Sequence, residues 1–141
     1  MYLYWLKEKK IMKLPRNWKS HLEIITNQHS KKEIEYVLQL SLPKKPTPIN
    51  VGYIYITKDD GFNFVKVVSV IPQLRGKGCG SMLYEYAIEQ LGSLSTHYHD
   101  ASSLAQKVWR RLIQKYDYTG DFFAGVLTVF KKPVDKRRKR R

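Results

Sequence analysis

Apolar side chains follow a strand-like pattern in three neighbouring parts of the chain. Residues 32–42 place an apolar or aromatic side chain at every second position, and residues 51–57 and 62–71 are rich in β-branched and aromatic residues. Since successive side chains of a strand point to opposite faces, these segments predict three strands. Asp59-Asp60-Gly61 predicts a hairpin turn between the second and third strands, because glycine tolerates a positive φ.

The stretch before these strands has the spacing of a helix. Pro15 suits a first helical turn, and Trp18, Leu22 and Ile25 follow three or four residues apart. The pattern therefore predicts a helix over residues 15–27.

The second half of the chain alternates predicted helices and strands. Helical spacing continues from Ser81 to Leu91, where Gly92 is expected to end the helix. A short strand is expected at 94–98 and a last strand at 122–130. A helix is expected at 102–116, with Asp100 or Ser102 as its cap and these residues on one face: Leu104, Ala105, Val108, Trp109 and Leu112. Together the elements predict a mixed α/β (α+β) fold in which helices flank a largely antiparallel sheet.

Length and charge limit the organisation of the chain. Its 141 residues suit a single domain, and the net charge of +14 favours acidic partners. Residues 131–141 carry a net +7 and residues 1–20 a net +5, so the body between them is nearly neutral. We expect one domain over residues 1–130, in which residues 1–11 are either an extension or a first strand. Residues 131–141 are expected to form a disordered basic tail that binds nucleic acid or only aids solubility.

The remaining composition bears on the compartment. Cys79 is the only cysteine, which excludes an intrachain disulfide and fits a reducing environment. No apolar run is long enough to span a membrane, and charged residues interrupt any signal-like segment near the N-terminus. A cytoplasmic protein without a membrane span is expected.

A glycine-rich loop between a predicted strand and a predicted helix is the most informative feature. Residues 75–80 read RGKGCG, and glycines at such a junction let backbone N–H groups approach a ligand. The helix start adds unpaired donors and positive dipole character, so the segment predicts a phosphate-binding loop. Neither the Walker spacing nor the GxGxxG dinucleotide spacing is present.

The loop resembles the signature of the GCN5-related N-acetyltransferase (GNAT) superfamily. Arg75, Gly78 and Gly80 fill its arginine–two residues–Gly–x–Gly pattern within VVSVIPQLRGKGCGSMLYEYA. The resemblance implies that the loop binds the pyrophosphate of acetyl-CoA and that the main chain near Val68 and Val70 pairs with the pantetheine arm. The cofactor-binding residues it implies are Val68, Val70, Arg75, Gly76, Lys77, Gly78, Cys79, Gly80, Ser81 and Ser102. Cys79 is interpreted as hydrophobic filler in this loop and not as an acyl carrier.

The chain departs from the family where a tyrosine often protonates the leaving thiolate. In the corresponding run Ser102 stands in place of an asparagine and Trp109 in place of that tyrosine. An indole N–H cannot serve as a practical acid. The candidate catalytic residues are instead His97, His99 and Tyr116. The two histidines would share one face of the short strand, and Asp100 could orient one ring. A structural role for the histidines and a metal site are the alternatives.

These observations leave three hypotheses for function. The first is an acetyl-CoA-dependent N-acetyltransferase that acts on a primary amine, with a nucleic-acid-associated acceptor as one interpretation of the tail. The second is a catalytically reduced GNAT-fold module that binds DNA or RNA through its basic ends. The third is an acetyltransferase of small molecules for which the tail is irrelevant.

Overall fold

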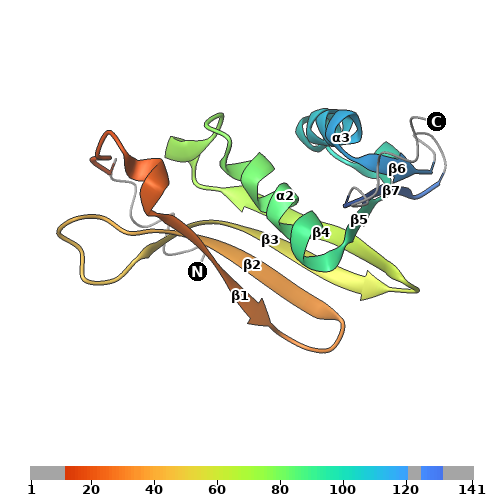
Figure 1. The fold of residues 1–141 in the computed structure, drawn as a ribbon, viewed down its shortest axis with the longest axis horizontal. Helices are drawn as coiled ribbons and strands as arrows, with labels where there is room; N and C mark the ends of the chain where they lie inside the picture. The colour runs from red at the N-terminus through yellow and green to blue at the C-terminus, as the bar shows by residue number, and fades with distance from the viewer. Residues whose placement is uncertain (1–11, 121–124, 132–141) are drawn as a thin grey trace, which may run out of the picture.

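The computed structural model describes residues 12–120 and 125–131, which form one seven-stranded sheet with helices on one face (Figure 1). The strands lie in the order β1-β2-β3-β4-β5-β7-β6. Their bounds are β1 Leu22–Gln28, β2 Glu33–Leu40, β3 Ile49–Asp59, β4 Phe62–Val70, β5 Ser93–Thr96, β6 Asp117–Thr119 and β7 Leu127–Phe130. All neighbours are antiparallel except β4 and β5. The mixed, largely antiparallel fold predicted from the sequence is confirmed.

Strands β1 to β4 form an antiparallel meander joined by short connections. The hairpin between β3 and β4 turns at Asp60 and Gly61, whose φ angles are 53° and 85°. Two consecutive positive φ angles suit the right-handed twist of the strands on either side, which is why the Asp-Gly pair occurs here. The predicted turn and the three predicted strands, which correspond to β2, β3 and β4, are confirmed.

The helix predicted over residues 15–27 is wrong. Only a 3₁₀ turn, η1 (Trp18–His21), forms there, and residues 22–28 become β1. Ile24, Ile25 and Thr26 are β-branched and favour a strand. The whole of β1 pairs with β2. This seven-residue ladder stabilises a strand, although Trp18, Leu22 and Ile25 also have helical spacing.

Two long helices connect the second half of the sheet. Helix α2 (Cys79–Leu91) joins β4 to β5 and ends at Gly92, whose φ is 85°. Helix α3 (Ser103–Lys115) follows the 3₁₀ turn η3 (Tyr98–Asp100) and begins at Ser102, whose side chain accepts a hydrogen bond from the backbone N of Ala105. Both predicted helices are confirmed, as is the cap at Ser102.

Four details of the second half differ from the prediction. The strand expected at 94–98 ends at Thr96, because residues 98–100 form η3. The last strand begins at Leu127, and residues 122–124 of the segment expected to start it lie outside the described residues. Strand β6 was not predicted, since three residues are too few to show a period. Leu104, expected on the buried face of α3, is 75% exposed.

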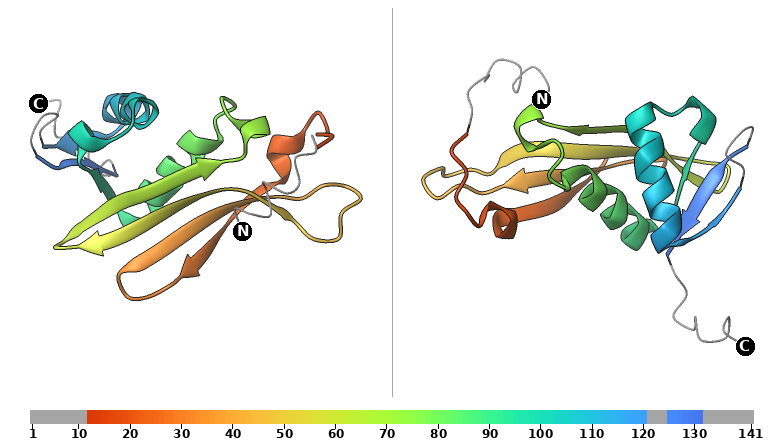
Figure 2. Two further views of the ribbon diagram at one scale, coloured as in Figure 1. Left: turned by 180° about the vertical axis from the view of Figure 1, so that it is seen from behind. Right: turned by 90° about the horizontal axis from the view of Figure 1, so that it is seen from above.

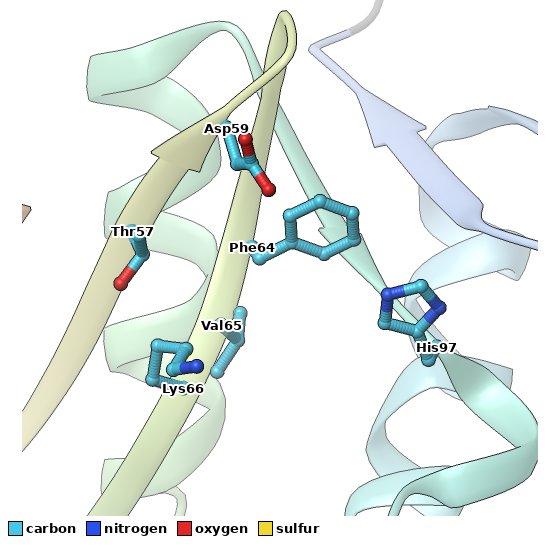
Figure 3. A pocket seen from close by; sticks show the side chains of 6 residues that line it. All are labelled: Thr57, Asp59, Phe64, Val65, Lys66 and His97. Atoms are coloured by element: carbon cyan, nitrogen blue, oxygen red, sulfur yellow. The ribbon is translucent and has the colours of Figure 1, made fainter. Parts of the chain in front are cut away.

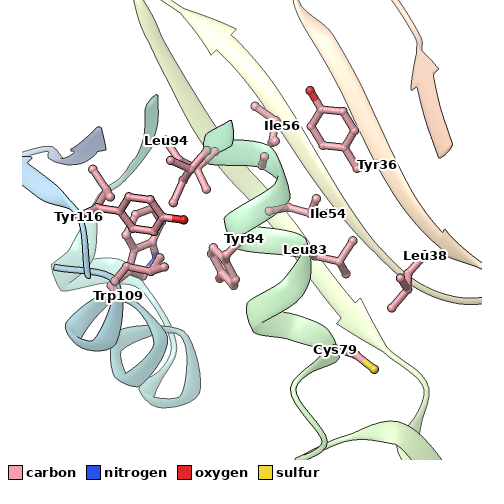
Figure 4. Packing of buried hydrophobic residues seen from close by; sticks show 14 of the residues in the cluster. Tyr36, Leu38, Ile54, Ile56, Cys79, Leu83, Tyr84, Leu94, Trp109 and Tyr116 are labelled. Carbon is pink, nitrogen blue, oxygen red and sulfur yellow. The ribbon is translucent and has the colours of Figure 1, made fainter. Parts of the chain in front are cut away.

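The hydrophobic core lies between the sheet and the two helices (Figure 4). Tyr84 of α2 and Trp109 of α3 meet edge to face with their ring centroids 5.5 Å apart, so the helices lie side by side over the same face (Figure 2). In β3, Ile54 and Ile56 point into this core. Their neighbours Tyr55 and Thr57 therefore point to the opposite face, which no helix of the described residues covers.

The chain ends are described only in part. Residues 1–11 and 132–141 lie outside the described residues, so an N-terminal extension and a disordered basic tail stay predictions. Lys131, the first residue of the predicted tail, is attached to the body: its backbone N donates to the oxygen of Gly92, and its Nζ lies 3.2 Å from Oε1 of Glu89. Among the described helices, none is long and apolar enough to cross a membrane.

Candidate functional site

Strands β4 and β5 run parallel but stay paired at only one position. Phe64 pairs with Ser95, and no further register pair joins the two strands. Just beyond this point β4 contains a bulge: Val65 is opposite Ile56 and Val67 is opposite Tyr55, which leaves Lys66 as the extra residue. A bulge bends its strand and increases the local twist. The result is a parallel pair that opens toward the C-terminal ends of β4 and β5.

The edge of β4 that faces this opening presents backbone hydrogen-bonding groups. The backbone N of Ile71 donates to the oxygen of Val51 in β3, so strand alternation turns the N–H and C=O of Val70 and Val68 toward β5. The carbonyl of Val70 accepts a hydrogen bond of 3.1 Å from Nε of Arg75. An extended ligand with amide groups could pair with this edge as an added strand does. The geometry thus places the two predicted strand residues, Val68 and Val70, at the opening.

The glycine loop lies at the end of the same opening. It follows the 3₁₀ turn η2 (Pro72–Leu74), and Gly76 and Gly78 have φ angles of 76° and 91°. Gly78 is the N-cap of α2 and makes no side-chain cap hydrogen bond. A Cβ placed at Gly76, Gly78 or Gly80 would have no atom within 4 Å, so the loop leaves space for a ligand above the first N–H groups of α2. Arg75 and Lys77 are exposed on the loop, and Ser81 lies in the first turn of α2.

The segment before β1 contacts this loop, which the sequence alone did not reveal. The side-chain amide of Gln73 accepts from the backbone N of Met12 at 2.8 Å and donates to the backbone O of Met12 at 2.7 Å. Burial raises the pKa of the Cys79 thiol, and Lys19, seven residues beyond Met12, opposes this shift together with Lys77. Part of the basic N-terminal segment therefore adds positive charge beside the glycine loop.

Cys79 is buried at the first position of α2. It is 2% exposed, and burial raises the pKa of its thiol more strongly than Lys19 and Lys77 lower it. The group is therefore a protonated thiol near neutral pH, and the thiolate is the nucleophilic form. This environment suits the interpretation of Cys79 as filler.

Cys79 is expected to resist thiol reagents in the folded protein. At pH 8 the native chain should react with Ellman's reagent at least about 100-fold more slowly than the chain unfolded in guanidinium, since the thiol is both buried and protonated. The absorbance of the released thiolate measures both rates. Equal rates would contradict the burial of Cys79.

A pocket of about 310 Å³ opens where β4 and β5 diverge (Figure 3). The imidazole of His97 stacks on the ring of Phe64, with centroids 4.9 Å apart and planes 8° apart. Phe64 pairs with Thr57, so the pocket lies on the sheet face opposite α2. Its lining residues are Thr57, Asp59, Phe64, Val65, Lys66 and His97. The pocket combines a titratable ring, a carboxylate and an ammonium at the apex of the opening.

The two candidate histidines are not equivalent. The sequence placed His97 and His99 on one strand face, but residues 98–100 form η3, so this alternation does not apply. Both histidines are exposed, but only His97 lines the pocket. Tyr98 between them is buried and fixed by α3: Arg110 donates to its hydroxyl at 2.8 Å, and Gln106 donates to its backbone oxygen at 2.9 Å.

Trp109 and Tyr116 belong to the core and not to this pocket (Figure 4). Trp109 is 1% exposed, so it is a packing residue. Tyr116 follows the end of α3, and the pKa of its phenol is raised chiefly by burial and further by Glu85, while Lys115 opposes the shift. Ser102 uses its hydroxyl to cap α3. A catalytic role for Tyr116 and a cofactor contact for Ser102 stay predictions.

Within residues 12–120 and 125–131, no group of three or more His, Cys, Asp or Glu side chains is arranged to hold a metal ion.

Solved acyltransferase structures are similar to this chain. A Klebsiella pneumoniae protein assigned as an acyl-CoA N-acyltransferase matches with a TM-score of 0.52 and 16% identity, over 92% of this chain and 85% of that chain. The ribosomal-protein-S18-alanine N-acetyltransferase of Escherichia coli matches with a TM-score of 0.49 and 10% identity, over 76% of this chain and 75% of that chain. No protein-family model and no curated protein sequence matches the chain. At 16% identity the Klebsiella structure supports a shared fold, and activity has to be argued from the site.

Proposed function

This chain has the fold of the GCN5-related N-acetyltransferases, and from that fold and its site we propose that it transfers an acetyl group from acetyl-CoA to a primary amine. The observation that carries the proposal is the open edge of β4, which leads from the bulge at Lys66 to the glycine loop at 75–80. Neither feature alone would suffice, because open strand edges and glycine turns are common. Here the open edge of β4 is followed directly by the glycine loop at the start of α2. This arrangement suits a long ligand that has amides at one end and phosphates at the other.

The residues present fit acetyl-CoA in this way. The first N–H groups of α2, with Arg75 and Lys77, would hold the pyrophosphate above Gly76, Gly78 and Gly80. The main chain at Val68 and Val70 would pair with the amides of the pantetheine arm. Since Arg75 bonds the carbonyl of Val70 in this structure, its guanidinium would exchange that carbonyl for phosphate when the cosubstrate binds.

The pocket at His97 would receive the acceptor amine. The amine nitrogen forms a bond to the acetyl carbon, the C–S bond breaks, and the sulfur needs a proton as it leaves. His97 lies at the apex of the opening with its ring fixed against Phe64, and histidine exchanges protons near neutral pH. We assign His97 to this proton transfer, because Trp109 is packed in the core and has no acidic proton to give.

His97→Ala is expected to lower kcat by about 100-fold while the Kd for CoA changes little, since general acid–base catalysis contributes at least this much. His97→Phe is the matched control: it preserves the stack on Phe64 but not the proton transfer, so its kcat should fall equally. His99→Ala tests the exposed neighbour in the same assay. Wild-type turnover in the variants of both histidines would contradict a required histidine.

The proposal is tested by calorimetry followed by turnover. Wild-type protein should bind CoA with one site per chain and release CoA from acetyl-CoA in the presence of an amine chosen from lysine-containing peptides, polyamines and amino-modified nucleic acids. Failure to bind CoA would overturn the proposal. A chain that binds CoA but acetylates no amine would match the second hypothesis, a catalytically reduced module, which the replacement of the tyrosine by Trp109 favours.

The basic ends support a further part of the proposal, an acceptor associated with nucleic acid. The charge of residues 131–141 would bring the catalytic body to a phosphate-rich partner without entering the chemistry.

A further inference from the structure

A second histidine lies on the uncovered sheet face, in contact with a buried carboxylate. Glu35 of β2 is 8% exposed and is the one charged residue among the described part of the chain that is buried. His29, in the turn between β1 and β2, places its Nε2 3.1 Å from Oε1 of Glu35. Asn27 donates to the same oxygen at 3.5 Å. Burial of a carboxylate is costly unless hydrogen bonds compensate it, so this pair is a specific arrangement.

The contact fixes both the ring and its protonation pattern. A carboxylate only accepts hydrogen bonds, so Nε2 of His29 is the donor in this contact, and whenever the ring is neutral Nδ1 is its basic nitrogen. The side chain of His29 is 45% exposed, whereas that of Glu35 is 11% exposed. The ring also stacks on Tyr55, with centroids 5.4 Å apart. A half-exposed imidazole with one nitrogen held by a carboxylate is suited to accept a proton at its other nitrogen.

The sheet register places this pair beside the pocket of His97. Glu35 is opposite Tyr55, and Tyr55 and Thr57 lie on the same face of β3, about 7 Å apart along the strand. Thr57 lines the pocket. Its pairing partner in β4 is Phe64, and the ring of His97 stacks on the ring of Phe64. His29 therefore lies on the same sheet face as the pocket, beyond Thr57 on the side away from His97, and is not itself one of the lining residues.

We propose that His29 is a catalytic base that removes a proton from the acceptor ammonium, directly or through one water, and that Glu35 is the residue that positions it. This inference rests on the proposed acetyl transfer. The ammonium gives one proton to Nδ1 of His29, and its lone pair then forms the C–N bond to the acetyl carbon. The C–S bond breaks with its electron pair on sulfur, and the thiolate takes a second amine proton by way of His97. The third hydrogen remains on the amide product.

The test compares two acceptors that differ in their need for a base. Spermidine is an ammonium at neutral pH, whereas hydroxylamine is already unprotonated. His29→Gln should lower kcat with spermidine by about 100-fold and with hydroxylamine by less than about 3-fold, because the second acceptor has no proton to lose before it attacks. Glu35→Gln should change kcat in the same direction with a smaller effect. His21→Gln, a histidine variant in η1, is the matched control and should behave as wild type.

A purely structural pair would give a different pattern. It would lower turnover equally with both acceptors, which would overturn the inference. Ring ¹⁵N–¹H spectra offer a readout without turnover: the wild type should show His29 with its proton on Nε2, and Glu35→Gln should lose this single tautomer. If the wild type binds CoA but acetylates neither probe, the base assignment fails alone. If it does not bind CoA, the proposed function fails with it.

Discussion

Gly78→Glu is expected to abolish measurable binding of CoA. The residue caps α2 with a φ of 91°, and a Cβ there would point into open space above the helix start. A glutamate would place a negative charge where we propose that the pyrophosphate binds. Repulsion between like charges costs several kcal/mol, and at about 1.4 kcal/mol for each tenfold change the Kd should rise by at least about 100-fold. Isothermal titration calorimetry with CoA measures this Kd.

The control for Gly78→Glu is Gly61→Glu. Gly61 has a φ of 85°, and a Cβ added to it would also have no atom within 4 Å, but it lies in the hairpin between β3 and β4. Both variants therefore carry the same charge change and a similar backbone strain of about 1–2 kcal/mol. Only Gly78→Glu should lose CoA. Arg75→Ala should weaken binding in the same direction. Equal affinity in Gly78→Glu and Gly61→Glu would exclude the loop as the phosphate site.

The glycine loop was predictable because its chemistry is local. A positive φ at Gly76 and Gly78 and a helix that begins at Cys79 follow from neighbouring residues, and the strand before them has a clear pattern. The same holds for the turn at Asp60 and Gly61. Where a feature depends on a few adjacent residues, the sequence contains what is needed to predict it.

Features that depend on register were not predictable. Residues 22–28 satisfy helical spacing, and only their ladder with β2 decides for a strand. The contact between His29 and Glu35 requires the turn between β1 and β2 and the pairing of Glu35 with Tyr55. The contact of Gln73 with Met12 joins segments 61 residues apart. The periodicity of the sequence does not predict such contacts, because they form only once the strands have paired.

The replacement of the family's tyrosine is informative for the same reason. The sequence shows that Trp109 stands there, but only the packing shows that its ring is enclosed by the core and meets Tyr84. A proton donor at this position would have to work from within the core. The catalysis that we propose therefore relies on groups on the uncovered face of the sheet, where His97 and His29 lie.

Trp109→Ala is expected to destabilise the fold by about 3–5 kcal/mol, the usual cost of removing a large buried aromatic side chain. Trp109 is 1% exposed and contacts the edge of Tyr84, so its loss opens a cavity where α2 and α3 pack together. Urea unfolding followed by circular dichroism gives the difference in free energy. A typical domain has only about 5–15 kcal/mol in total, so the midpoint should fall markedly.

Leu104→Ala is the matched control for Trp109→Ala, because it shortens an apolar side chain of the same helix that is 75% exposed. Its free energy of unfolding should stay within about 0.5 kcal/mol of wild type. Trp109→Tyr separates packing from chemistry: it restores the family's residue in a buried position, so kcat should not rise above that of wild type. A gain in turnover from Trp109→Tyr would show that the side chain at this position reaches the thiolate. The acid would then be this tyrosine and not His97.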